Sequence, residues 1–245
     1  MKRITIALTA MLAVASLTTA ANAAVISYWN ENTVAFPDGT FGYTPSSFPQ
    51  APNAGNGSLN LANFDTTTGG ANGAYTYIQN FTGTTTNAQF GDPSGGALSP
   101  QGGADNGQGV LSNNGMQILI SSNTTGYTDI NLSWAQRGTS TGFTSRAFEY
   151  STNGGGSFTP LAFTGDTGAL SATFTTVSPN LTGITALENN ANVVFRLTLS
   201  GATNSSGNNR FDNFVVQGTA IPEPATFGLL MVAGLAFAAS RRRNG

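Results

Sequence analysis

The sequence predicts an all-β fold: an antiparallel, jelly-roll-like β-sandwich flanked by an N-terminal signal peptide and a C-terminal single transmembrane helix. Residues 24–219 are rich in Gly, Asn, Thr and Ser, and short apolar alternations separate these turn-forming clusters. No clear linker divides this region into two domains. The chain has no cysteine, so its stability must come from a packed core, which a body of about 200 residues is long enough to bury.

The N-terminus has the three parts of a secretory signal peptide. Lys2 and Arg3 form a basic start, and residues 4–19 are apolar to weakly polar. Ala21 and Ala23 then supply the small residues of an A-x-A cleavage site, so we expect residues 1–23 to be removed before Ala24. An uncleaved N-terminal anchor is disfavoured because the apolar stretch is short and interrupted by Thr and Ser.

The first half of the body contains two expected strands. Residues 25–29 and 74–81 are rich in β-branched and aromatic residues. Between them, several prolines and many Gly and Asn residues predict long loops. The glycine-rich residues 92–109 are expected to form a loop or an insertion.

Strand signals are more regular in the second half. Residues 116–120 are a candidate strand, and Ile130, Leu132 and Trp134 alternate with polar residues in the next one. Period two places these three apolar side chains on one face, so Trp134 is expected in the core.

The closing part of the body predicts a hairpin followed by two strands. Residues 148–150 lead into the turn at 151–157, where Asn-Gly tolerates positive φ, and 158–163 would return. Residues 193–200 show the clearest alternation, and 210–217 close the domain. The hairpin at 150–155 together with the closing segment at 210–216 resembles jelly-roll modules of bacterial surface proteins and secreted enzymes. That resemblance implies a β-sandwich with an accessory role and supplies no catalytic residue.

The last twenty-six residues, 220–245, form a second terminal signal. Pro222, Glu223 and Pro224 precede an uncharged run at 225–240, and Arg241, Arg242 and Arg243 follow it. As a helix, this run would reach about 24 Å, slightly less than the ~30 Å hydrocarbon core of a bilayer. The arginines would hold its end in the cytoplasm. A permanent anchor and a removable sorting signal both fit these features.

Together, the Pro-Glu-Pro, the apolar run and the arginines resemble the PEP-CTERM sorting domain of Gram-negative bacteria. The resemblance covers about a tenth of the chain, in the expected order and at its very end. It implies export, transient anchoring in the inner membrane through the C-terminal helix, and cleavage near Pro222-Glu223-Pro224 by an exosortase. Release to the cell surface or to the exopolysaccharide matrix of a biofilm would follow.

Composition excludes several classes of function for the body. Residues 24–220 contain ten acidic residues, four arginines and no lysine, which gives a net charge of −6. Such a chain cannot assemble the basic face that nucleic acid requires. The absence of histidine and cysteine removes Ser-His-Asp and Cys-His nucleophilic sites and thiolate or imidazole metal sites.

Oxygen chemistry remains, and two kinds of site are considered. Asp129, Glu149 and Asp212 could share a face as the carboxylates of a glycoside hydrolase, although solvent-facing or turn-forming roles are favoured for them. Asp212 and Asn213, with a loop residue such as Asp105 or Asp166, could hold a structural calcium ion, because calcium prefers carboxylate, amide and carbonyl oxygens.

Exposed aromatic rings would point to polysaccharide. The candidates are Trp29, Tyr43, Tyr75, Tyr77 and Tyr127, although core or loop packing is favoured for each. The leading hypothesis is a secreted, non-enzymatic β-sandwich protein of the surface or matrix that binds polysaccharide. The alternatives are a carboxylate-based hydrolase of matrix polysaccharide and a structural matrix protein without a specific ligand.

Overall fold

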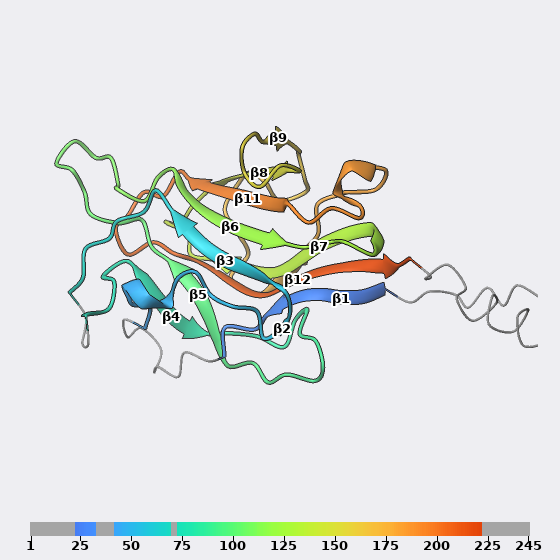
Figure 1. Cartoon of the computed structure of the whole chain (residues 1–245). Helices are drawn as coiled ribbons and strands as arrows, with labels where there is room; N and C mark the ends of the chain where they lie inside the picture. The colour runs from blue at the N-terminus through green and yellow to red at the C-terminus, as the bar shows by residue number, and fades with distance from the viewer. Residues whose placement is uncertain (1–22, 33–41, 70–72, 222–245) are drawn as a thin grey trace, which may run out of the picture.

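The computed structural model describes residues 23–32, 42–69 and 73–221 as two antiparallel β-sheets with short 3-10 turns (Figure 1). One sheet has the order β10-β7-β12-β1-β2, with β5 beside β12 and β4 beside β5. Its strands are β1 (Ala23–Trp29), β2 (Ala54–Gly55), β4 (Ile78–Thr82), β5 (Gly96–Pro100), β7 (Tyr127–Gly138), β10 (Thr175–Val177) and β12 (Asn209–Ala220). We call it sheet A.

The second sheet, sheet B, has the order β3-β6-β11-β8-β9. Its strands are β3 (Gly57–Ala62), β6 (Met116–Ser122), β8 (Ser145–Ser151), β9 (Thr159–Pro160) and β11 (Val193–Ser200). In Figure 1, β3, β6 and β11 form one layer, and β5, β12 and β1 form the other. The 3-10 turns include η1 (Pro45–Ser47) and η3 (Thr185–Leu187).

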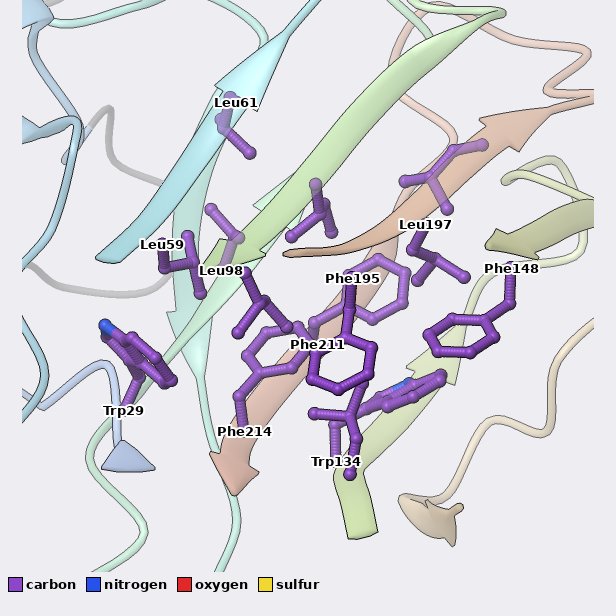
Figure 2. Close-up of a cluster of buried hydrophobic side chains, with 14 of the residues drawn as sticks. Trp29, Leu59, Leu61, Leu98, Trp134, Phe148, Phe195, Leu197, Phe211 and Phe214 are labelled. Carbon is purple, nitrogen blue, oxygen red and sulfur yellow. The ribbon is translucent and has the colours of Figure 1, made fainter. Parts of the chain in front are cut away.

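The core fills the space between the two sheets. Along β11 every second residue from Val193 is buried, as the alternating sequence requires. Figure 2 shows Phe195 of this strand pointing toward Phe211 and Phe214 of β12. Trp134 is 1% exposed, and its ring lies 6.1 Å from that of Phe214. The expectation that Trp134 belongs to the core is confirmed.

Most of the expected strands are present, with several departures. Residues 92–109 are not a continuous loop, because β5 lies within them and pairs with β4. Residues 74–77 are not in a strand, and of 158–163 only Thr159–Pro160 is. β3 was not anticipated, although Leu59 and Leu61 alternate with polar residues, and it forms the edge of sheet B beside β6.

β12 and β1 bring the two ends of the described chain together. Ala23 pairs with Thr219, and Ala24 pairs with Gly218. Figure 1 shows the start of β1 beside the end of β12. The main-chain N–H of Ile221 donates to the carbonyl of Gly126 over 2.8 Å. The polypeptide is therefore hydrogen-bonded to the body up to the residue before Pro222.

The terminal signals fall largely outside the described residues. Ala21 and the rest of residues 1–22, Pro222 to Pro224, the apolar run 225–240 and Arg241 to Arg243 all lie there. Within the described residues, no helix is long and apolar enough to span a bilayer. Cleavage before Ala24 and the C-terminal helix stay predictions.

Candidate functional site

The most unusual polar environment lies where β12 changes its neighbour. One edge of β12 pairs with β7. The other edge pairs with β5 at Phe211 and with β1 from Phe214 onward. Asp212 and Asn213 lie at this change, in a β-bulge, and both are at most 1% exposed. The φ of Asn213 is 52°, a left-handed conformation that asparagine tolerates better than most residues. We call this region the β12 junction.

Asn213 fixes the loop at 84–87 against the junction. Its Nδ2 donates to the carbonyls of Thr84 and Thr86 over 2.7 and 2.9 Å, and its Oδ1 accepts from the Tyr28 hydroxyl over 2.8 Å. Both ends of this amide are already engaged. The arrangement therefore gives Asn213 a positioning role and does not support the expectation that it is a cation ligand.

Asp212 is a buried carboxylate held by main-chain groups. Its Oδ2 accepts from the N–H of Thr84 over 2.7 Å, and its Oδ1 accepts from the N–H of Asn213 over 2.8 Å. Burial raises the pKa of Asp212 to about 8, and the negative charge of Glu31 adds to the increase. The two N–H donors act in the opposite direction.

Glu31 is the second buried carboxylate of the junction. It lies two residues after the end of the strand β1, and it is 3% exposed. Its Oε2 accepts from the Tyr43 hydroxyl over 2.7 Å and from Gln50 Nε2 over 3.2 Å, whereas Oε1 has no hydrogen-bond partner among the described residues. Burial raises the pKa of Glu31. Sequence reasoning missed this residue.

The other carboxylates considered for calcium lie in different surroundings. Asp105 closes its own loop by accepting from the N–H groups of Gly107 and Gly109. Asp166 lies near the guanidinium of Arg146. Burial lowers the pKa of this guanidinium, and the negative charge of Asp166 partly offsets the decrease. Across the described ranges, no group of three or more His, Cys, Asp or Glu side chains gathers as a metal site would require.

The three carboxylates considered for hydrolysis are not brought together. Asp212 is buried in sheet A, and Glu149 pairs with Arg196 on the outer face of sheet B over 2.6 Å. Asp129 is exposed at the start of β7, where its N–H donates to Glu188 Oε1 over 3.1 Å. Asp129 and Glu188 instead line a surface cavity of about 390 Å³ beside residues 178–183.

A groove crosses the outer face of sheet B. Its volume is about 360 Å³, and its lining residues come from β3, β6, β11 and the turn after β8. Polar side chains, among them Asn60 and Gln117, line it together with apolar ones such as Leu119. At one side the guanidinium of Arg196 lies 3.7 Å from the ring centroid of Phe158 while it pairs with Glu149. We call this feature the sheet B groove.

Three of the aromatic residues considered for sugar stacking are buried. Trp29 is 1% exposed, Tyr43 is 0% exposed and Tyr75 is 7% exposed, so their rings cannot receive a sugar. Tyr77 and Tyr127 are partly exposed, and neither lines the sheet B groove. The aromatic ring that does line this groove is that of Phe158, which follows the glycine-rich turn.

Comparison with known proteins identifies the tail. A family model of the PEP-CTERM protein-sorting motif matches residues 220–243. The chain therefore carries this sorting motif, as the resemblance of residues 222–224 and 241–243 predicted. The motif indicates export and membrane-anchored sorting by an exosortase. No curated protein matches the sequence.

Three solved structures are similar to the body at low identity. The cleaved K2 adhesin domain of Lys-gingipain is 12% identical with a TM-score of 0.40, over 78% of this chain and 97% of that one. The CBM22-1 xylan-binding domain of Paenibacillus barcinonensis Xyn10C is 8% identical with a TM-score of 0.39, over 82% and 99%. An arabinose-bound α-L-arabinofuranosidase, MgGH51, is 12% identical with a TM-score of 0.34, over 78% and 26%. Similarities at this level do not bear on function.

Proposed function

We propose that this chain, which ends in a PEP-CTERM sorting motif, is a non-enzymatic, jelly-roll-like surface protein that binds polysaccharide outside the cell. Its signal peptide directs export, and its C-terminal helix holds it transiently in the inner membrane. An exosortase then cuts near Pro222-Glu223-Pro224 and releases the body to the cell surface or matrix.

The observation that carries the binding proposal is the sheet B groove. Hydroxyl and amide side chains on its floor, such as Ser58, Asn60 and Gln117, offer both donors and acceptors to sugar hydroxyls. The ring of Phe158 supplies an apolar wall, and the Arg196–Glu149 pair supplies charged hydrogen-bonding groups. Because the body has a net charge of −6, the groove favours a neutral polysaccharide over a polyanionic one.

Affinity electrophoresis tests the binding proposal directly. The full-length protein would be run through gels containing a neutral xylan, a neutral glucan or an acidic exopolysaccharide. We expect retardation by at least one neutral polymer, and a loss of several-fold in affinity for Gln117→Ala and Phe158→Ala. Gln108→Ala, on the exposed loop at 105–109, is the matched control and should keep the affinity of the unaltered protein.

The hydrolase alternative is tested with the same polymers. Release of reducing sugar that is lost in both Asp129→Asn and Glu188→Gln would establish an enzyme and overturn the non-enzymatic proposal. Retardation without sugar release supports a binding protein. Neither retardation nor release across the panel would favour a structural matrix protein without a specific ligand.

A further inference from the structure

A second hollow of about 320 Å³ adjoins the sheet B groove on the outer face of the sheet. Both hollows are lined by Ser121, Gly154 and Val194, so they are continuous. The second hollow extends past these residues to Asn123, which follows β6, and to Asn192, which precedes β11. We call the two hollows together the sheet B trough.

The trough runs along the direction of the strands. Cross-strand pairing places Ser58 of β3, Ser121 of β6 and Val194 of β11 in one row across the sheet. From this row the sheet B groove extends toward Gln117, and the second hollow extends the other way toward Asn123. At about 3.3 Å per residue, the extended chain from Gln117 to Asn123 covers about 20 Å. This length suits several sugar rings in line.

The residues shared by the two hollows leave the middle of the trough low. Gly154 has no side chain, Val194 has a short one, and the hydroxyl of Ser121 is hydrogen-bonded to that of Ser58 over 2.7 Å. None of the three shared residues has a long side chain that would divide the trough. A single ligand chain can therefore occupy both hollows.

The turn after β8 lies along one side of the trough, and β3 lies along the other (Figure 1). Hydrogen bonds hold this turn in place. Ser151 Oγ accepts from the Gly155 N–H over 2.9 Å, and the Gly154 N–H donates to the carbonyl of Asn192 over 2.8 Å. The turn is thus tied to the segment that lines the second hollow. A side that is already ordered loses little conformational entropy when a ligand binds.

We propose that the sheet B trough binds an extended, linear segment of neutral polysaccharide, several rings long, that lies along β6 and β11. This inference rests on the proposed function and adds the form of the ligand to it. Hydroxyl and amide groups along the trough can donate to and accept from the hydroxyls of successive rings. A chain that reaches Asn192 gains contacts that a short oligosaccharide in the sheet B groove does not make.

Isothermal titration calorimetry with oligosaccharides of two lengths tests the trough. The full-length protein in detergent would be titrated with the trisaccharide and the hexasaccharide of the neutral polymer that retards it in affinity electrophoresis. We expect the hexasaccharide to bind about tenfold tighter. Asn192→Ala should weaken binding of the hexasaccharide several-fold and leave that of the trisaccharide unchanged. Phe158→Ala should weaken both, and the control Gln108→Ala should weaken neither.

The Asn192→Ala variant separates contacts in the second hollow from a general effect of chain length. A longer chain offers more binding registers, and that gain is the same in the variant. The substitution keeps the main-chain carbonyl that accepts from Gly154, so the melting temperature should not change. Equal affinity for both oligosaccharides, or an increase with length that Asn192→Ala retains in full, would overturn the trough and leave the proposed function standing. Failure to bind any neutral polymer would overturn both.

Discussion

At the scale of the residue, folding has removed several titratable groups of the body from water. Asp212 and Glu31 are buried carboxylates at the β12 junction, and Arg146 is a buried guanidinium that is 1% exposed. Burial raises the pKa values of the two carboxyl groups and so favours their neutral forms. The guanidinium of Arg146 instead donates to three main-chain carbonyls.

The protein is expected to lose stability as the pH rises from about 5 to 8. The pKa of Asp212 is about 8 in the folded state, against an ordinary value of 3.8, because of burial and the nearby charge of Glu31. Between these values the folded state holds a proton that the unfolded state has released, so each rise in pH favours unfolding. Chemical denaturation across this range should show a fall on the order of a few kcal/mol, and Asp212→Asn should flatten it. A rise with pH would contradict this account.

Arg146→Ala should destabilise the body strongly. The guanidinium donates to the carbonyls of Gly165, Phe143 and Gly168 over 2.7, 2.8 and 2.9 Å. Removing it leaves three carbonyls without their donor and a hole beneath the loop after β9, which should cost about 3 kcal/mol or more in the free energy of unfolding.

The matched control for Arg146 is Arg196→Ala. The side chain of Arg196 is 23% exposed, so solvent can replace its partners, and the cost should be about 1 kcal/mol or less. Equal losses in urea denaturation would show that burial of Arg146 is not what makes it important.

The sequence alone pointed to Asp212 and Asn213 of the β12 junction but not to Glu31. Asp212 could be named as a candidate because an Asp-Asn pair in a closing strand offers oxygen ligands. Glu31 could not, because nothing local in the sequence shows that the residues after β1 meet the segment before β5. That contact depends on β12 exchanging one neighbour for another at a bulge, which is a property of the pairing and not of any single strand.

At the scale of the element, period-two alternation located the strands whose two faces differ. β6, β7 and β11 each have one face in the core and were expected from their sequences. β5 was missed because Ala97 to Ser99 are all fully buried, so the strand shows no alternation, and its ends are Gly96 and Pro100. Pairing with β4 and β12 overrides the weak strand preference of these residues.

Phe195 on β11 provides a test of the core between the sheets. Its ring stacks on Phe148 at a centroid distance of 6.0 Å and is 1% exposed. Phe195→Ala should cost about 3 to 5 kcal/mol through lost burial and the cavity left behind. Thr198→Ala, on the outer face of the same strand, should cost less than about 1 kcal/mol. Similar losses for both variants in urea denaturation would contradict the assignment of the inner face.

The end of β12 sets the position of the sorting motif. Ala220 pairs with Tyr127, and Ile221 is hydrogen-bonded to Gly126, so the motif begins where the sheet ends. We expect a six-residue Gly-Ser insertion between Ala220 and Ile221 to speed exosortase-dependent processing, because the peptide would stand clear of the body. The same insertion after Gly107 is the control. Pulse-chase labelling measures both rates, and unchanged or slower processing would show that the folded end of β12 does not limit access.

At the scale of the whole molecule, the chain combines a cysteine-free β-sheet body with a C-terminal sorting motif. Sequence alone identified the sorting motif, because its parts are short, ordered and local. It could not locate the sheet B groove, which is assembled from β3, β6, β11 and the turn after β8. The proposed binding surface depends on the order of the strands in the sheet, whereas the sorting motif is encoded in one short segment of the sequence.

The most direct test of this account is the intact mass and cell fraction of the protein in one host with an exosortase and in the same host without it. We predict loss of residues 1–23 in both hosts. Only with the exosortase should the segment after Pro222-Glu223-Pro224 also be lost and the body be found outside the cell. A protein that keeps its C-terminal segment and stays in the membrane in both hosts would contradict the account and make that segment a permanent anchor.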